Sequence, residues 1–389
     1  MTLQDESLAI HAKYKGKLET HSKVPLVTRY DFSLAYTPGV AAVCEAIVKD
    51  KNAARTYTLK ANTVAVISDG SAVLGLGNIG PEAAIPVMEG KAVIFKELAG
   101  IDAFPICLAC QDVQTTIQTI RNIAPVFAGI NLEDFKAPEC FTIELALQDL
   151  GIPVMHDDQH GTAVVVLAGL INALKVASKA KEDVRVVING VGAAGVAITN
   201  LLLTAGFSGP KMLLCDTKGI IHYGRDDLGT TLKADLSRVT NTDRKRGDLS
   251  AALKDADVFI GVSKGNLVTK TMVESMAPKP IVFALANPIP EISVDDAVAA
   301  GAAVVATGRS DYPNQVNNSL AFPGIFRGAI DCNATKITTN MKLAAGYALA
   351  SLTAEPRKDE ILPFATDRRI VAAVAQAVKD AWHAEQKHS

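Results

Sequence analysis

A short glycine-rich loop between a strand and a helix is the feature that most constrains the fold of this chain of 389 residues. Residues 184–189 (VRVVIN) predict a buried strand, the loop GVGAAG covers 190–195, and residues 196–205 predict a helix. A second strand over 211–215 (KMLLC) ends at Asp216. A strand, a helix and a parallel strand in this order form one βαβ unit with a right-handed crossover. The pattern therefore predicts a parallel sheet of the Rossmann type.

The same loop has the spacing GxGxxG, which is typical of dinucleotide binding when it lies between a strand and a helix. Gly190 permits the tight turn, Gly192 lets the backbone approach a pyrophosphate, and Gly195 lets the helix pack closely on the strand. Backbone N–H groups near the helix N-terminus, with Ala193 and Ala194, can donate to the phosphates. These five residues form the predicted cofactor-binding loop. The alternative is a purely structural glycine turn.

An acidic residue at the end of the second strand bears on which nucleotide is bound. Asp216 is placed to accept hydrogen bonds from a ribose hydroxyl, and its charge would repel the 2′-phosphate of NADP. Lys218, two residues further on, could offset that repulsion. The sequence therefore favours NAD and leaves NADP open.

A second GxGxxG, over 75–80, competes with the first. Two glycines and a loop separate it from the preceding predicted strand over 62–67. The acid downstream, Glu97, lies inside a predicted helix over 81–99 rather than at the end of a strand. We interpret the segment as a loop whose backbone lies close to the substrate or to the other domain. Binding of nucleotide phosphate at this loop is the alternative.

The composition fits an α/β protein of two domains. Hydrophobic residues make up 49% of the chain and aromatic residues only 5%, which suits parallel sheets covered by helices on both faces. We expect a first domain over 1–160 that binds substrate and metal, and a doubly wound, nucleotide-binding domain over 161–389. The C-terminal helices could pack back on the first domain. Further predicted strands cover 103–108, 257–262, 281–286 and 303–307, and further predicted helices cover 113–128, 138–150, 341–353, 367–385 and the segment from Gly161.

Charge and hydropathy exclude several classes of function. The net charge is −2 and no long basic run occurs, so binding to nucleic acid has little electrostatic support. No window approaches about 20 uninterrupted apolar residues, and the N-terminus lacks the apolar core of a signal peptide, so no membrane span is expected. Six scattered cysteines, mostly in apolar runs, are typical of reduced, buried thiols. We expect a cytoplasmic protein.

Carboxylates gather at two places that follow short apolar segments. Glu133 and Asp134 lie in INLEDF, and Asp157 and Asp158 lie in MHDDQHGT. Ligands bind at the carboxyl ends of strands in open α/β sheets. Oxygen ligands with open positions suit Mg²⁺ or Mn²⁺. The sequence predicts a metal site here, and solvated loop acids or helix caps are the alternative.

Two histidines suggest a different metal. His156 and His160 have the i,i+4 spacing of zinc-binding helices, which would make the chain a zinc hydrolase. The apolar segment before them and Gly161 directly after them argue against a helix through both, and no third ligand is evident. Cys107 and Cys110 lack a second cysteine pair and lie at a predicted strand, so they do not indicate structural zinc.

Two further side chains are candidates for proton transfer. Lys91 lies in a mostly apolar predicted helix, beside Gly90. A surface lysine is the common case, but a buried lysine near a metal can lose its proton near neutral pH and act as a base. Tyr36 precedes a proline turn in AYTPGV. It is either a packing residue or an acid that delivers a proton beside a cation.

These features together resemble the malic enzyme family, and specifically its short bacterial branch. The resemblance extends from about residue 14 to 350, nearly the whole chain. The segments that carry it are YTPGV (36–40), SDGSAVLGLGNIGPEA (68–83), PVMEGKA (86–92), LEDF (132–135), HDDQHGTA (156–163), the GVGAAG loop, ANP (286–288) and NNSLAFPG (317–324).

The resemblance implies a role for each acidic candidate and for the lysine. Glu133, Asp134 and Asp158 would hold Mg²⁺ or Mn²⁺. Asp157 would orient its neighbours from just outside the ion's own ligands. Lys91 would be the general base.

It also implies roles for more distant residues. Tyr36 would be the general acid, and Asn287 and Asn318 would contact the substrate, with Asn287 beside the cofactor as well. One departure concerns substrate binding, because longer members carry an arginine for a malate carboxylate in the loop that matches Ser71 and Ala72. Ala72 cannot replace that arginine, so Ser71, backbone N–H groups or a partner subunit would bind the carboxylate.

The resemblance implies oxidative decarboxylation of L-malate to pyruvate and CO2, with reduction of NAD or NADP and dependence on Mg²⁺ or Mn²⁺. It also implies a homodimer, in which Tyr36 could reach a neighbouring subunit's site, and we expect decarboxylation of oxaloacetate as a side activity. Three alternatives remain: a two-domain dehydrogenase acting on amino acids, an inactive nucleotide-binding sensor, and a zinc hydrolase. Metal dependence, malate-dependent reduction and zinc content distinguish them.

Overall fold

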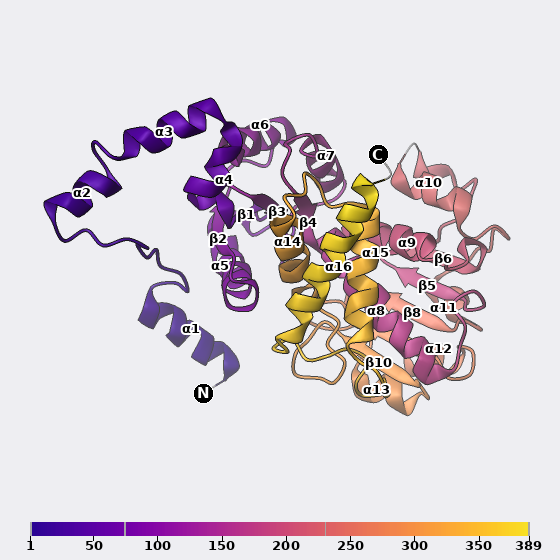
Figure 1. Cartoon of the computed structure of the whole chain (residues 1–389). Helices are drawn as coiled ribbons and strands as arrows, with labels where there is room; N and C mark the ends of the chain where they lie inside the picture. The colour runs from indigo at the N-terminus through magenta and orange to yellow at the C-terminus, as the bar shows by residue number, and fades with distance from the viewer. Residues whose placement is uncertain (1, 74, 230, 388–389) are drawn as a thin grey trace.

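The computed structural model describes residues 2–73, 75–229 and 231–387, and it contains two sheets flanked by helices (Figure 1). The first sheet has four strands in the order β2-β1-β3-β4, and all its neighbours are parallel. Its strands are largely apolar, and β1, β3 and β4 are fully buried, as expected of a sheet covered on both faces. They are β1 (Thr63–Ser68), β2 (Asp102–Cys107), β3 (Gly129–Leu132) and β4 (Val154–His156).

The second sheet has six strands in the order β10-β9-β8-β5-β6-β7. Every neighbouring pair is parallel except β6 with β7. The chain leaves β5 toward β6 and later returns to β8 on its other side, so the sheet is doubly wound with its switch point at β5. This confirms the predicted fold class. The strands are β5 (Val186–Asn189), β6 (Met212–Asp216), β7 (Gly219–Ile220), β8 (Val258–Gly261), β9 (Ile281–Ala284) and β10 (Val304–Thr307).

Helices connect and cover the strands. Those after the first sheet's strands are α5 (Gly80–Ala99), α6 (Val113–Ile123), α7 (Glu139–Ala146) and α8 (Asp157–Ala177). Those of the second sheet are α9 (Ala193–Thr204), α10 (Leu232–Val239), α11 (Leu249–Leu253), α12 (Lys270–Glu274) and α13 (Val294–Ala299). Short 3₁₀ turns occur at η1 (Lys51–Ala53), η2 (Leu59–Ala61), η3 (Ala124–Val126), η4 (Gly209–Lys211), η5 (Asp226–Leu228) and η6 (Asn318–Leu320).

Three C-terminal helices pack beside the first sheet's helices. They are α14 (Phe322–Asp331), α15 (Thr339–Ser351) and α16 (Arg369–Gln386), and Figure 1 shows them side by side. Helix α14 packs on α5 and α15 packs on α8. Phe95 of α5 stacks against Phe322 and Phe326 of α14, with ring centroids 4.7 and 5.4 Å apart. Residues from both halves of the chain thus share one apolar core.

Two described segments are long and apolar enough to be compared with membrane spans. One is α8, of which 72% is buried within the protein. The other, Arg29–Lys49, is not buried, and it is divided into two helices around Tyr36. A core helix passes the same test of length and composition, so α8 is explained by its packing between α9 and α15.

The N-terminal segment forms an arm that extends away from the sheets (Figure 1). It consists of α1 (Leu3–Tyr14), α2 (Arg29–Ala35) and α3 (Val40–Lys49), and the single turn α4 (Ala54–Tyr57) joins it to the body of the protein, where Arg55 donates a hydrogen bond to Asn333. None of these helices buries a residue. Several large apolar side chains are therefore exposed on the arm, among them Val27, Tyr30, Leu34 and Val48.

Candidate active site

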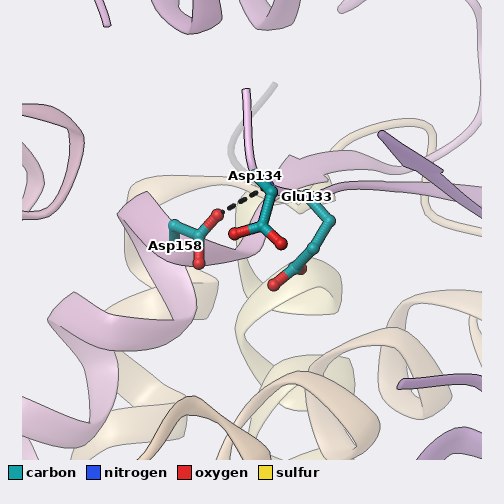
Figure 2. Close-up of side chains that lie close together, drawn as sticks. All are labelled: Glu133, Asp134 and Asp158. Atoms are coloured by element: carbon teal, nitrogen blue, oxygen red, sulfur yellow. Dashed lines mark hydrogen bonds between the residues drawn. The ribbon is translucent and has the colours of Figure 1, made fainter. Parts of the chain in front are cut away.

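The register of two neighbouring strands brings the acidic residues together. Leu132, the last residue of β3, pairs with His156, the last residue of β4. The residues that follow, Glu133 and Asp134 on one side and Asp158 on the other, therefore leave the sheet at the same edge. One carboxylate oxygen from each of the three residues lies within 4.8 Å of the other two (Figure 2). The sheet thus brings together acids from two segments of the chain. Asp134 and Asp158, for example, are 24 residues apart in the sequence.

The backbone holds this acidic cluster in shape. Asp134 has a φ of 56°, an uncommon left-handed conformation for a residue other than glycine. Its N–H donates to Oδ2 of Asp158 at 2.9 Å, the dashed line in Figure 2. Its carbonyl accepts the N–H of Ala72 at 2.9 Å. These backbone contacts hold Asp134 and Asp158 in place, so the two side chains do not belong to a freely solvated loop.

The prediction that Asp157 and Asp158 lie in a loop is wrong. Helix α8 begins at Asp157, directly after β4, rather than at Gly161. Both aspartates therefore lie in the first turn of a helix, where the partial positive charge of the helix terminus stabilises carboxylates. A helical first turn holds side chains more precisely than a loop.

Glu133 and its neighbours fit a divalent cation. Asn131 donates to Oε2 of Glu133 at 3.0 Å, and Nζ of Lys91 lies 3.0 Å from Oε1. Burial and the nearby Asp158 raise the pKa of Glu133 well above its usual range. Crowded, buried carboxylates of this kind need a positive partner, and a set of oxygen donors alone suits Mg²⁺ or Mn²⁺. The donor set therefore fits the expected ion.

Lys91 is buried beside the acids, as expected of a functional lysine rather than a surface lysine. Its Nζ contacts Oδ2 of Asp157 as well as Glu133, and it lies 4.4 Å from the ring centroid of Phe322. Burial lowers the pKa of Lys91, but the attraction of Asp157, Glu133 and Asp158 outweighs burial and raises it. Without a bound cation, the carboxylates therefore hold the proton on the amine, and the role of Lys91 as a base beside a metal stays a prediction.

The histidine pair does not form a zinc site. His156 is the N-cap of α8 and His160 lies in the helix, so a helix does continue from one to the other, contrary to the expectation. Nε2 of His160 lies 3.0 Å from a carboxylate oxygen of Glu144, which occupies it. Among the described residues, the one group of three possible ligands is Glu133, Asp134 and Asp158. Zinc hydrolysis therefore has no support in the structure.

The glycine loop has the geometry that a pyrophosphate requires. Gly190 has a φ of 104°, and a side chain there would meet the carbonyl of Val262. A side chain at Gly195 would collide with the carbonyl of Gly190, whereas nothing lies within 4 Å of the corresponding position at Gly192. Helix α9 begins at Ala193, three residues earlier than predicted, and it has no side-chain cap. Its first N–H groups can therefore donate to an anion.

Asp216 differs from the expected free ribose acceptor. Its Oδ1 accepts the N–H of Lys218 at 3.0 Å and Nη1 of Arg225 at 3.0 Å. Its Oδ2 accepts Nη2 of Arg225 at 2.6 Å and Nζ of Lys233 at 3.1 Å. Burial raises the pKa of Asp216, but these donors outweigh it and lower the pKa to about 2. The carboxylate already has four donors, so its charge is largely neutralised.

The remaining predicted residues make contacts of their own outside the regular strands and long helices. Gly75, in the second glycine motif, has its backbone against the carbonyl of Asn287, as expected of a loop that touches the other half of the chain. Cβ of Asn318 lies close to Gly161, in the turn that carries Asp157. Ser71 is buried, and its hydroxyl accepts the N–H of Lys136 at 3.0 Å.

Two family models match this chain, one over each half. Residues 15–148 match the family model for the N-terminal domain of malic enzyme. Residues 159–382 match the model for its NAD binding domain. The chain belongs to the malic enzyme family. This confirms the resemblance, and it excludes the amino-acid dehydrogenase and the zinc hydrolase as alternatives.

Relatives within the malic enzyme family are similar over almost the whole chain. The bifunctional malic/malolactic enzyme of Bacillus subtilis is 54% identical over 384 residues, which cover 98% of this chain and 93% of the relative. The NAD-dependent malic enzyme of Geobacillus stearothermophilus is 53% identical, with 98% and 79% covered. The crystal structure of the NAD-dependent malic enzyme of Thermotoga maritima has a TM-score of 0.92 at 50% identity, with 96% and 98% covered.

Tyr36 is the one predicted catalytic residue of this malic enzyme that lies apart from the others. It ends α2 on the N-terminal arm, and its side chain is 63% exposed. Its ring packs edge-on against Phe32, with centroids 5.9 Å apart. A single chain therefore does not bring Tyr36 to Lys91.

Several residues at the malic enzyme site were missed by sequence reasoning. Asn131 could have been found, because it lies two residues before Glu133 on β3 and alternate residues of a strand share a face. Phe322 lies in the segment NNSLAFPG, but its contact with Lys91 crosses more than half of the chain. Glu144 and Arg225 lie nearer to His160 and Asp216 along the chain, yet no local pattern indicates these pairings.

Proposed function

We propose that this chain catalyses the oxidative decarboxylation of L-malate to pyruvate and CO2, with reduction of NAD or NADP. The observation that carries the proposal is a buried lysine, Lys91, whose Nζ lies 3.0 Å from a carboxylate of a three-acid cluster. Oxidation of a hydroxyl group needs a proton acceptor beside the reacting carbon. The amine of Lys91 would serve once a bound cation offsets the charge of the carboxylates that hold its proton. The names of the relatives, which include NAD- and NADP-dependent malic enzymes, support this reaction.

The acidic cluster is the proposed site of Mg²⁺ or Mn²⁺. Glu133, Asp134 and Asp158 would hold the ion. When bound, such an ion supplies Lewis-acid stabilisation of the negative charge that develops on oxygen. Asp157 would orient the amine of Lys91, which it contacts directly. Asn131 would keep Glu133 directed at the cluster through its hydrogen bond.

Substrate orientation is proposed for three polar residues around this cluster. Asn318 lies beside Gly161 of α8, and Asn287 follows the carboxyl end of β9, where its carbonyl lies against Gly75. Ser71, with nearby backbone N–H groups, would bind a malate carboxylate in place of the arginine that Ala72 lacks. Proton transfer from malate to Lys91 would accompany hydride transfer to the nicotinamide, which the glycine loop orients by binding the pyrophosphate.

Tyr36 is proposed to donate a proton to C3 of enolpyruvate after CO2 has left. Because Tyr36 is on an exposed arm, we propose that it acts in the site of a second copy of the chain within a homodimer. Exposed apolar side chains on the same arm, such as Val27, Tyr30 and Leu34, support an arm that a partner subunit covers.

The proposal also covers the cofactor preference, a side activity and the domain boundary. NAD is the favoured cofactor, and NADP is accepted because Arg225 and Lys233 neutralise the charge of Asp216. Decarboxylation of oxaloacetate is a side activity. The chain divides into domains over 1–160 and 161–389, which the matched ranges 15–148 and 159–382 support.

Absorbance of the reduced nicotinamide tests the function directly. Malate, NAD or NADP, and Mn²⁺ are expected to give an increase that a chelator abolishes. Asp158→Ala should lose both activity and Mn²⁺ binding, whereas the control Asp149→Ala, at an exposed acid paired with Arg121, should keep both. Binding of NAD without malate-dependent reduction would instead support an inactive nucleotide sensor.

A further inference from the structure

One carboxylate contacts both ends of the segment that carries the two aspartates of α8. Glu144, on α7, accepts the backbone N–H of His156 on Oε1 at 3.0 Å. Its other carboxylate oxygen lies 3.0 Å from Nε2 of His160. Asp157 and Asp158 lie between these two contacts along the chain. A single side chain from another helix therefore holds the first turn of α8 at two points.

The Glu144 carboxylate is well suited to this role because it is buried and charged. Only 8% of the residue is exposed. Burial raises the pKa of Glu144, but His160, Lys342 and His156 outweigh burial and lower the pKa to about 2. Lys342 comes from α15, a third helix that packs on α8. A buried charge with such partners stays in one place, since moving it would leave it without compensation.

The start of α8 depends on this outside contact. His156 is the N-cap of the helix, and its side chain makes no capping hydrogen bond. Without a cap, the first N–H groups of a helix lack partners and the first turn frays. Glu144 takes the N–H of His156 and adds negative charge at the positive end of the helix.

The turn held in this way directs both aspartates toward the site. Asp157 points at Lys91, which it contacts. Asp158 accepts the N–H of Asp134, which fixes one of its oxygens within the acidic cluster. Small rotations of the turn would break both contacts at once, because the two residues are adjacent.

We propose that Glu144 and His160 form a positioning pair that fixes the first turn of α8 and thereby sets the affinity of the acidic cluster for a divalent cation. Neither residue of the pair is among the proposed ligands of the ion, which are Glu133, Asp134 and Asp158. The inference rests on the proposed function, since it assigns the cluster to Mg²⁺ or Mn²⁺. Supporting residues around metal ligands commonly change metal affinity about 10- to 100-fold when they are lost.

Titration of the folded chain with Mn²⁺ alone, by calorimetry and without malate or nucleotide, tests the pair. Glu144→Ala is expected to weaken Mn²⁺ binding about 10- to 100-fold. Glu144→Gln keeps an acceptor for the N–H of His156 and an amide toward His160 but loses the charge, so it should bind Mn²⁺ more tightly than Glu144→Ala and more weakly than wild type. Glu139→Ala is the matched control, because Glu139 lies on the same helix and pairs with Lys136 instead.

Each result decides between positioning and a general structural role. Glu144→Ala could fold, melt at a lower temperature and still bind Mn²⁺ as tightly as Glu139→Ala. That result would overturn the inference, because only the stability of the protein would have changed. If Glu144→Ala does not fold, His160→Ala decides: about tenfold weaker binding supports the pair, and unchanged binding overturns it. Failure of the wild-type chain to bind Mn²⁺ would instead reject the proposed metal site.

Discussion

Nζ of Lys91 lies 3.0 Å from Oε1 of Glu133, and both side chains are buried. This ion pair joins α5 to the end of β3, and the second contact of Lys91, with Asp157, joins α5 to the start of α8. The amine thus lies where the two acidic segments meet. Beside a cation that neutralised the carboxylates, an amine in this position would be able to receive a proton from the substrate.

Lys91→Ala is expected to lower kcat about 10²- to 10⁴-fold at saturating malate, NAD and Mn²⁺, since that is the usual contribution of one general base. The fold should persist, as checked by circular dichroism. Lys96→Ala is the control, because Lys96 lies on the same helix but is 56% exposed and pairs with Asp102. A kcat near wild type in Lys91→Ala would remove the lysine from the reaction.

Tyr36→Phe removes only the phenolic proton donor, so a comparable loss of kcat, about 10²- to 10⁴-fold, is expected without a change in stability. Tyr30→Phe, an exposed tyrosine on the same helix, is the control and should remain active. Steady-state rates with malate and NAD provide the measurement. Full activity in Tyr36→Phe would mean that another group protonates the product.

Mixing the two inactive variants tests whether Tyr36 acts in a neighbouring subunit. In a mixed dimer of Lys91→Ala and Tyr36→Phe, one site would combine an intact Lys91 with the other chain's intact Tyr36. Activity should therefore reappear when the variants are unfolded and refolded together, but not when each is refolded alone. No recovery in verified mixed dimers would place Tyr36 in its own chain's site or outside the mechanism.

Lys233→Ala is expected to lower kcat/KM for NADP about tenfold while leaving kcat/KM for NAD nearly unchanged. The reason is that Nζ of Lys233 lies 3.1 Å from Asp216 and can contact an added 2′-phosphate, and a hydrogen bond to a charged group contributes about 1.5–3 kcal/mol. Initial rates with each cofactor measure the ratio. Lys211→Ala, at a lysine outside this group that pairs with Asp183, serves as the control. Equal losses with both cofactors would contradict a role in cofactor discrimination.

Stability should rise with pH above 8 because of Lys342. Burial lowers the pKa of Lys342 from 10.5 to about 8, although Glu144 opposes this shift. Between these values the unfolded chain binds more protons than the folded chain, so the free energy of unfolding increases with pH. Below pH 8 both states are protonated and this contribution is constant.

Urea unfolding over that pH range measures the effect of Lys342. In Lys342→Met the rise should become shallower, because no amine with a lowered pKa remains to lose its proton. Lys336→Met, at an exposed lysine, should keep the wild-type slope. Identical slopes in all three proteins would show that Lys342 does not differ between the folded and unfolded states.

Much of the fold could be predicted from local patterns. Apolar runs of strand length alternate with helical segments, and the spacing of Gly190, Gly192 and Gly195 indicates the turn between β5 and α9. The acids at Glu133 and Asp158 could be predicted because residues that directly follow parallel strands gather at one edge of a sheet. These properties depend on a few neighbouring residues, and so they can be read without coordinates.

The electrostatic partners could not be predicted in the same way. Asp216 looks like a free ribose acceptor until Arg225 and Lys233 fold back onto it. Lys91 looks like a lysine ready to lose its proton until Asp157 and Glu133 surround the amine. A pKa depends on charges and burial supplied by other elements, which spacing along the chain does not report.

The amino-acid sequence by itself therefore determined the two largely parallel sheets, the glycine loop and the acids that gather at one edge of the first sheet, because backbone periodicity and turn chemistry are local. Tertiary structure alone decided that Asp157 begins a helix, that Glu144 holds it, and that Tyr36 lies apart from Lys91. The physical reason is that contact energies fall off within a few ångströms, and only packing brings residues distant along the chain within that range.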